Sequence, residues 1–255
     1  MSSARSTPLP LILASAFFFG AAYFTSRFPE VPGASAGSYA ATFLIALPAF
    51  IALFRYLGAR WAVISLVAVS LFAFAIEATG VATSFPYGRF YYGDALGPLV
   101  FGLVPYLLPL SYAPLVIGAV AATYRPRYPR IAPWALRSAA LLVLMDGVLD
   151  PGATALGFWV WPDGGAYYGV PLTNYLGWLL SGVLASALLL TSGRWRGRPL
   201  PALLDSVIIA MAFWTGVAVF SGLVLPALLG TAVLLFLFYR RRVFQAHVGL
   251  TSKPG

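Results

Sequence analysis

The sequence contains no cysteine, a single lysine and a single histidine. Without cysteine the chain has no disulfide, no thiolate metal site and no thiol nucleophile. The lysine is Lys253, near the C-terminus, so no helix carries the lysine that a retinal Schiff base in a rhodopsin requires. The histidine is His247, which excludes the histidine-rich iron sites of membrane oxygenases and desaturases. No G-x-G-x-x-G or P-loop pattern opens a helix, so no nucleotide site is predicted.

Charged residues are also scarce, at 9% of a chain that is 60% hydrophobic. A soluble domain does not have this composition, and apolar runs long enough to cross a membrane recur along the whole length. The predicted fold class is all-α: a polytopic membrane bundle of about eight transmembrane helices, forming one integral-membrane domain over residues 1–255. The expected segments are 9–25, 37–57, 61–82, 98–123, 134–152, 172–191, 203–220 and 222–239.

The positions of the 16 basic residues predict the topology. Lys and Arg concentrate in cytoplasmic loops, and all but Arg27 and Arg89 fall on one face when the eight segments alternate. Both termini are therefore expected in the cytoplasm, with the protein in the inner (cytoplasmic) cell membrane. The net charge of +9 follows from these loops and does not predict nucleic-acid binding. The residues expected on the cytoplasmic face are Arg5, Arg55, Arg60, Arg125, Arg127, Arg130, Arg137, Arg194, Arg196, Arg198, Arg240, Arg241, Arg242 and Lys253.

The first segment has a second interpretation, as a signal peptide. Ala34, Ser35 and Ala36 match the small-residue pattern of a cleavage site. The distance from the apolar run to this pattern is long for a signal peptide, so we interpret the segment as a membrane helix.

Three of the seven acidic residues lie in or at the ends of apolar segments: Glu77, Asp146 and Asp150. An ionisable group at membrane depth is costly and usually functional, although a buried carboxylate can also cap a helix or pair with an arginine. The predicted topology places all three near the non-cytoplasmic face. Asp146 and Asp150 share one side of a helix, about 6 Å apart along its axis, and Pro151 is expected to end that helix. Apolar surroundings disfavour a charged carboxyl group, so one of them is predicted to act as an acid.

Two loops at the same predicted end, 83–97 and 157–171, are rich in aromatic residues. An aromatic belt at the membrane interface explains some of them, but their density and their Gly and Pro residues suit a lid over an apolar pocket. Arg89 either pairs with one of the three carboxylates or extends to the lipid head groups. Four prolines within 98–123 predict kinks that either open a groove or reflect irregular packing. The predicted substrate-binding residues are Tyr87, Arg89, Tyr91, Trp159, Trp161, Tyr167, Tyr168 and Asn174.

Asp146 and Asp150 also form a D-x-x-x-D pattern, which in other proteins binds Mg²⁺ and a diphosphate. Magnesium sites prefer more oxygen ligands near the phosphates, and no second aspartate pair or basic cluster is predicted on that face. A prenyl-diphosphate enzyme is therefore disfavoured.

Three stretches resemble a known family: EATGVATSFPYGRFYY, LLVLMDGVLDPGATALGFWVW and GGAYYGVPLTNYLGW. They are similar to the carotenoid biosynthesis membrane proteins that include carotenoid 1′,2′-hydratases and bacterioruberin-type hydratases, over about residues 61–190. The resemblance implies addition of water to the terminal double bond of an acyclic ψ end group, as in γ-carotene or lycopene, giving a tertiary alcohol. The implied partners are a lipophilic carotenoid, water and the lipid bilayer, together with other carotenoid-pathway enzymes.

Such a hydration requires no cofactor and no metal. It requires an acid to protonate C2, a site that tolerates a tertiary cation at C1, and a group that activates water. We predict that Asp146 or Asp150 is the acid, that the other aspartate or Glu77 orients water, and that loop aromatics shield the cation. Two alternatives stay open: a proton-coupled transporter with a carboxylate relay, and a non-catalytic carotenoid-binding protein. The transporter would need a water path through the cytoplasmic half, where Asp205, at the start of a helix, is the only acidic residue that the sequence offers.

Overall fold

The structure is a computed structural model that describes residues 7–28, 34–125, 130–195 and 197–251. Four of the basic residues used in the topology prediction, Arg5, Arg127, Arg196 and Lys253, lie outside these ranges.

The described part of the chain contains eight α-helices, and seven helical segments in it are long and apolar enough to cross a membrane. The remaining helix, α4, is equally apolar but short. This confirms the predicted all-α membrane bundle. The helices are α1 (Leu9–Arg27), α2 (Ala34–Leu57), α3 (Ala59–Thr83), α4 (Leu108–Ala122), α5 (Ile131–Ala155), α6 (Leu172–Ser192), α7 (Asp205–Phe220, preceded by the 3-10 turn η2, Pro201–Leu204) and α8 (Val224–Thr251).

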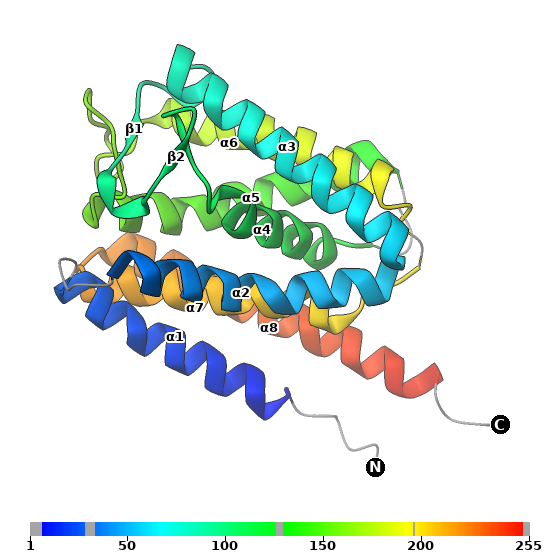
Figure 1. Ribbon diagram of the computed structural model, residues 1–255. Helices are drawn as coiled ribbons and strands as arrows, with labels where there is room; N and C mark the ends of the chain where they lie inside the picture. The colour runs from blue at the N-terminus through cyan, green and yellow to red at the C-terminus, as the bar shows by residue number, and fades with distance from the viewer. Residues whose placement is uncertain (1–6, 29–33, 126–129, 196, 252–255) are drawn as a thin grey trace.

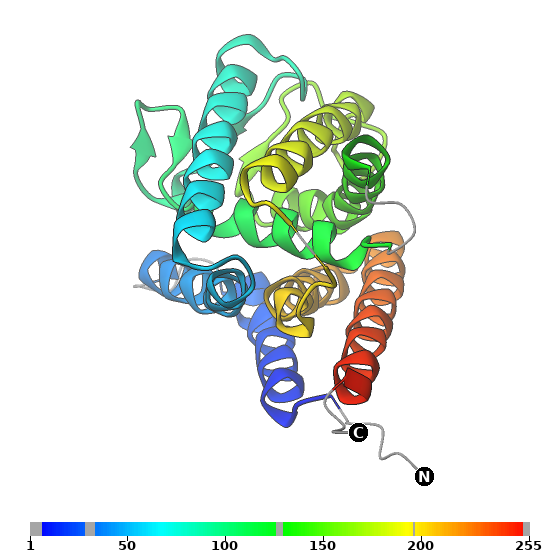
Figure 2. The same cartoon turned by 90° about the vertical axis from the view of Figure 1, so that its right-hand side faces the viewer.

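The bundle has two halves, with α3 to α6 in one and α1, α2, α7 and α8 in the other (Figure 1). Successive helices run in opposite directions, so α1 begins and α8 ends at the same end of the molecule. In the second half, α7 lies among α1, α2 and α8 (Figure 2). The short helix α4 packs against helices of both halves and is buried from Tyr112 to Ala122, so it forms the centre of the bundle.

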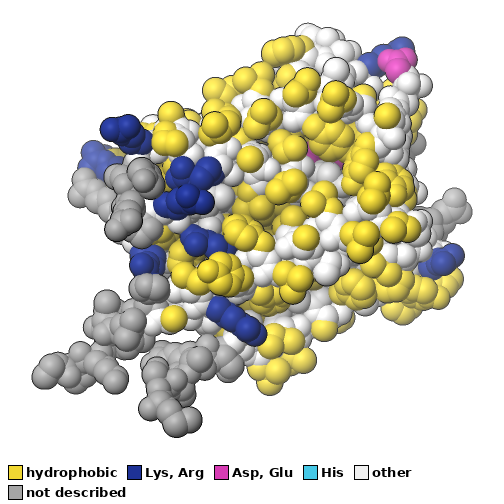
Figure 3. Space-filling view, turned by 180° about the vertical axis from the view of Figure 1, so that it is seen from behind, with side chains coloured by type: hydrophobic (Ala, Val, Ile, Leu, Met, Phe, Trp, Pro, Cys, Tyr) yellow, Lys and Arg dark blue, Asp and Glu magenta, His cyan; other side chains and the backbone are white. Residues whose placement is uncertain are grey.

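One end of the molecule carries most of the visible basic side chains, while its sides are largely hydrophobic (Figure 3). Arg60 and Arg194 both lie over the ring of Trp61, at 5.0 and 4.3 Å from its centre. Arg240 of α8 donates a 2.6 Å hydrogen bond to the carbonyl of Ala122 at the end of α4. These contacts bring the basic connections together at one end, as the sequence predicts. That this end faces the cytoplasm stays a prediction.

The prediction of a single membrane segment over 98–123 is wrong in its first part. The chain there forms a small hairpin, in which β2 (Leu99–Val100) pairs antiparallel with β3 (Val104–Pro105). Residues 101–103 connect the strands, and two of them, Phe101 and Gly102, have positive φ. Helix α4 begins only after the hairpin. An apolar run alone cannot distinguish a hairpin from a helix. Of the four prolines, Pro114 is the one inside the helix beyond its first turn.

The prediction that Pro151 ends its helix is also wrong, since α5 continues to Ala155. The helix ends where Gly157 adopts a φ of 67°, a left-handed conformation that glycine tolerates. The Phe158 amide then donates a 2.9 Å hydrogen bond back to the carbonyl of Ala153, as in a Schellman motif. Pro151 therefore lies one turn inside the helix, and Asp146 and Asp150 belong to one continuous helical segment.

The two aromatic loops are joined by a short antiparallel ladder. Strand β1 (Tyr91–Tyr92) pairs with β4 (Trp159–Val160), and Tyr92 lies opposite Trp159. The Gly93 amide extends the contact with a 2.8 Å hydrogen bond to the carbonyl of Phe158. The loop after α3 and the loop after α5 consequently cover the same end of the bundle.

Candidate active site

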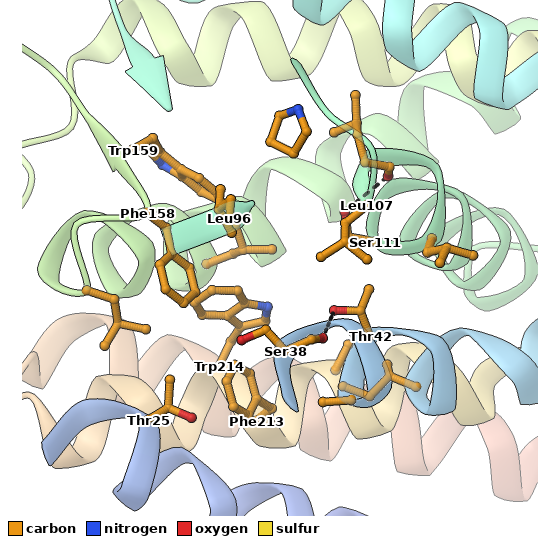
Figure 4. Close-up of a pocket in the computed structure, with 18 of the residues that line it drawn as sticks. Thr25, Ser38, Thr42, Leu96, Leu107, Ser111, Phe158, Trp159, Phe213 and Trp214 are labelled. Atoms are coloured by element: carbon orange, nitrogen blue, oxygen red, sulfur yellow. Dashed lines mark hydrogen bonds between the residues drawn. The ribbon is translucent and has the colours of Figure 1, made fainter. Parts of the chain in front are cut away.

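A cavity of about 740 Å³ lies inside the bundle beneath the joined loops. Its walls come from helices α1 to α7 and from both aromatic loops, and most of the lining side chains are apolar. Phe158 and Trp159 follow α5 and face the same space as Trp214 of α7 and Ser38 and Thr42 of α2 (Figure 4). The cavity is therefore suited to an extended hydrocarbon rather than to a charged ligand.

Asp146 and Asp150 form a buried pair with Asn174 of α6. The side-chain amide of Asn174 donates a 2.9 Å hydrogen bond to Asp146 Oδ2 and a second one to Asp150 Oδ2. The two carboxyl groups also interact directly, and both residues are at most 2% exposed. Asp150 and Asn174 line the cavity, whereas Asp146 does not. The pair thus presents one carboxyl group to the cavity and keeps the other beside it.

Glu77 of α3 is the third carboxyl group of this region, and it lines the same cavity. The hydroxyl of Tyr92 donates a 2.9 Å hydrogen bond to Glu77 Oε2. Burial raises the pKa of the Tyr92 phenol well above its usual value of 10.0, so this hydroxyl stays protonated and serves as a donor. Glu77 also lies within electrostatic range of Asp146 and Asp150. The structure therefore brings the three predicted carboxyl groups together.

A cluster of aromatic rings surrounds the carboxyl groups at this part of the cavity. The ring centres of Phe90 and Trp161 are 5.0 Å apart, those of Tyr92 and Trp159 6.1 Å, and those of Tyr87 and Phe90 6.1 Å. All five side chains line the cavity. Aromatic faces attract positive charge, so the cluster can stabilise a cation that forms next to the carboxyl groups.

Two glycines fix the position of Tyr87 between α3 and α6. A Cβ atom at Gly80 would lie 2.7 Å from the Tyr87 ring, and one at Gly177 would lie 2.6 Å from it. Thr173 donates a 3.2 Å hydrogen bond to the Tyr87 carbonyl. The ring therefore depends on the absence of a side chain on both neighbouring helices.

The structure places seven of the predicted site residues in or beside the cavity and four elsewhere. Tyr167 donates its hydroxyl to the carbonyl of Gly147 at 3.1 Å, and Tyr168 is 36% exposed. Arg89 and Tyr91 are exposed, and Arg89 forms no ion pair with any of the three carboxylates. The residues in or beside the cavity are Glu77, Asp146, Asp150, Tyr87, Trp159, Trp161 and Asn174.

Sequence reasoning did not select Tyr92, nor Tyr112 and Ser181, two buried residues that lie next to each other and to Tyr87. Neighbouring strand residues point to opposite sides, so the pairing of β1 with β4 is needed to show that Tyr92, and not Tyr91, turns toward Glu77. A hydroxyl within an apolar helix gives no signal in the sequence, because serine and tyrosine also occur there as packing residues.

The arrangement of the aspartates does not resemble a metal site. Within the described ranges, no three His, Cys, Asp or Glu side chains are placed to hold a metal ion. The Asn174 amide donates to both Asp146 and Asp150, and an N–H donor occupies the oxygen positions that a cation would need.

Comparisons with known proteins agree with the geometry. Residues 36–237 match the family described as "Carotenoid biosynthesis protein". A relative, the bisanhydrobacterioruberin hydratase of Haloarcula japonica, is 39% identical over 206 residues, which cover 76% of this chain and 69% of the relative. No solved structure matches the chain significantly. The matched region includes the three carboxyl groups and both aromatic loops.

Proposed function

Since this chain belongs to the carotenoid biosynthesis protein family, we propose that it is a carotenoid hydratase of the membrane. It adds water to the terminal double bond of an acyclic end group, as in γ-carotene or lycopene, and forms a tertiary alcohol. One observation carries the proposal: carboxyl groups and an amide gather in one part of a cavity that is otherwise apolar. The relative named as a hydratase supports the reaction class.

The shape of the cavity supports a long apolar substrate that arrives from the bilayer. Phe17 and Phe24 of α1 line the cavity and are 67% and 65% exposed on the outside of the bundle. The cavity therefore reaches the lipid-facing surface at α1. A carotenoid dissolved in the bilayer can place one end group beside the carboxyl groups and leave the rest of its chain along α1 and α2.

Asp150 is the proposed proton donor, because its carboxyl group lines the cavity and Asp146 and Asn174 support it. Two carboxyl groups this close share a proton more readily than both ionise. Transfer of that proton to C2 forms a C–H bond from the π electrons of the alkene and leaves a tertiary cation at C1. The ring faces of Trp159 and Trp161 stabilise this cation.

Water then attacks C1, and its oxygen supplies both electrons of the new C–O bond. Glu77 is the proposed group that orients this water, with Tyr92 holding the carboxylate in place. The proton released by the water returns to the carboxyl cluster, so the acid is regenerated. The net reaction is the addition of one water molecule, with no oxidation or reduction.

A proton-coupled transporter is less consistent with the cytoplasmic half of the bundle. Asp205 is the acidic residue there, and it forms an ion pair with Arg241 at 2.6 Å. Arg241 is only 4% exposed, so Asp205 is held by a fixed cation instead of lining a path for protons. The other alternative, a carotenoid-binding protein without enzymatic activity, is distinguished from a hydratase by the lycopene experiment described below.

The proposed location is the cytoplasmic membrane, with both termini in the cytoplasm and the active site near the opposite face. This orientation follows from the clustering of basic residues at the end where α1 begins and α8 ends. A topology reporter fused after Gly255 should be active in the cytoplasm. Activity only outside the cytoplasm would reverse the orientation.

The function is tested by expressing the protein in cells that accumulate lycopene, followed by mass analysis of the pigments. The expected product carries one added water, and a preparation made in water labelled with heavy oxygen should carry the label in its hydroxyl group. In D₂O the product should gain one non-exchanging deuterium at C2. Unchanged lycopene would support the carotenoid-binding alternative, and label arriving from O₂ would identify an oxygenase instead.

A further inference from the structure

A second group of polar atoms lies next to the carboxyl groups, and apart from Asp146, which supports the proposed proton donor, its members have no role in the steps above. It consists of the hydroxyl groups of Tyr87, Tyr112 and Ser181 and the Oδ1 atom of Asp146. All four residues are at most 2% exposed. None of the four oxygens forms a hydrogen bond of good geometry with a residue that the structure describes, although the Ser181 hydroxyl lies next to both phenols and the Tyr87 hydroxyl lies next to Glu77. Buried polar atoms without partners are rare in proteins and costly, so such a cluster points to a ligand.

The four groups come from four different elements that converge on one place. Tyr87 lies in the loop after α3, Tyr112 in α4, Ser181 in α6 and Asp146 in α5. The Ser181 hydroxyl approaches both phenols, and both phenols lie within electrostatic range of Asp146 and of Glu77. The cluster therefore lies close both to Asp146 and to the third carboxyl group, Glu77.

The chemistry of the cluster fits a water molecule. Burial raises the pKa of the Tyr87 phenol well above its usual value of 10.0, so its hydroxyl is a donor. The serine hydroxyl both donates and accepts, and the carboxyl oxygen of Asp146 accepts. A buried water usually makes two to four hydrogen bonds of this mixed kind, whereas an acyclic carotenoid end group has no polar atom to offer.

We infer that Tyr87, Tyr112 and Ser181, together with Asp146, bind the water molecule that attacks the substrate. The side chains of both tyrosines belong to the cavity wall, while their hydroxyl oxygens are buried behind it, so the bound water lies next to the reacting end of the substrate. This inference rests on the proposed hydratase function and adds to it the site from which water is delivered. In this scheme Tyr112 and Ser181 act when water attacks the cation. They have no part in the earlier step, in which protonation of the alkene forms the cation.

The separation of the two steps makes the inference testable. In D₂O, a cation that is not captured by water loses a proton from C2 or from a methyl group and returns to an alkene that carries deuterium. Deuterium in the recovered carotenoid thus reports protonation, while the alcohol reports capture. Both are measured by mass analysis in the same reaction of the full-length protein in membranes with lycopene.

The variants are Tyr112→Phe and Ser181→Ala, each of which removes one hydroxyl and little volume. We expect the ratio of deuterium exchange to hydration to rise about fivefold to tenfold in each, the effect of losing one hydrogen bond. Continued exchange shows that the variant is folded and binds the carotenoid. Ser186→Ala is the matched control, because Ser186 is also buried in α6 with an unpartnered hydroxyl but lies farther along the helix. Its ratio should equal that of the wild type.

Three results would overturn the inference. An unchanged ratio in both variants would show that the hydroxyls do not hold the reacting water. Exchange and hydration that fall together, in variants with the wild-type melting temperature, would assign the residues to protonation or substrate binding. A wild-type protein that gives no alcohol would overturn the proposed function itself, an outcome that the first two do not share.

Discussion

The hydroxyl of Tyr167 donates a 3.1 Å hydrogen bond to the carbonyl of Gly147. Pro151, four residues later, has no N–H with which to bond that carbonyl within the helix. A residue of the loop after α5 thus completes the backbone hydrogen bonding of α5 between the two aspartates. In a membrane bundle, where water does not replace a lost partner, such a contact is worth more than on a soluble surface.

Replacing Tyr167 by Phe should destabilise the protein, because the carbonyl of Gly147 then loses its hydrogen-bond donor. We expect the free energy of unfolding to fall by about 1 kcal/mol and turnover to fall moderately, because Asp146 and Asp150 flank the affected turn. Melting of the purified protein in detergent and pigment analysis measure the two effects. Tyr91→Phe is the control, since Tyr91 is 50% exposed. Equal melting temperatures for the two variants would contradict the role of Tyr167.

The carboxyl groups provide the second prediction. Asp150→Asn should reduce hydration by about 10²–10⁴-fold, the usual contribution of a general acid, because an amide cannot deliver the proton. Asp146→Asn and Glu77→Gln should also be severely impaired. Asp163→Asn, which changes an exposed aspartate in the loop after α5, should leave activity unchanged. Product formation is measured at equal protein levels, and near-normal turnover by the Asp150 variant would remove that residue from the catalytic set.

The glycine next to Tyr87 provides the third prediction. A Cβ at position 177 would meet the Tyr87 ring at 2.6 Å and the Pro86 carbonyl at 2.8 Å. Gly177→Ala should therefore cost about 1–3 kcal/mol of stability, as overpacking does, and should lower hydration by displacing Tyr87. In Gly20→Ala the new methyl group meets nothing within 4 Å, and alanine favours a helix, so that variant should be at least as stable as the wild type. Melting temperatures that do not differ between the two would show that the ring adjusts freely.

Two alanines of α1 allow a test of the cavity. Ala21 lines it, whereas Ala16 on the same helix is exposed and does not. Ala21→Trp should displace part of the substrate from the cavity. Each buried CH₂-sized group of the substrate contributes about 0.8 kcal/mol to binding. If two such groups are no longer buried, the affinity falls by roughly tenfold. Ala16→Trp should have no effect on the Michaelis constant for lycopene. A similar constant for both variants would place the substrate elsewhere.

Apart from the start of α4 and the end of α5, the sequence was sufficient to predict the helices, together with the convergence of Glu77, Asp146 and Asp150. Hydropathy marks the apolar segments, and alternating topology with a four-residue spacing brings the three side chains to one end. Asn174 was also predicted as a site residue, and the structure places its amide between the two aspartates.

Other features depend on interactions that local patterns do not contain. The hairpin before α4 is as apolar as a membrane helix, so composition could not reveal it. Helix α5 continues past Pro151, and Tyr167, from another segment, supplies the hydrogen bond that the carbonyl of Gly147 lacks there. The pairing of β1 with β4 determines which side chains of β1 face the site. The sequence does not contain this information, so Tyr91 was predicted as a substrate-binding residue instead of Tyr92.

The two-residue ladder between β1 and β4 makes the site cooperative. It places Tyr92, the partner of Glu77, directly opposite Trp159, which adjoins Asp150. A slip of one residue in either strand would turn the ring of that strand to the other face and separate Tyr92 from Trp159. The halves of the site on α3 and α5 therefore become competent together or not at all. Any insertion in one of the two loops requires a compensating change in the other before activity returns.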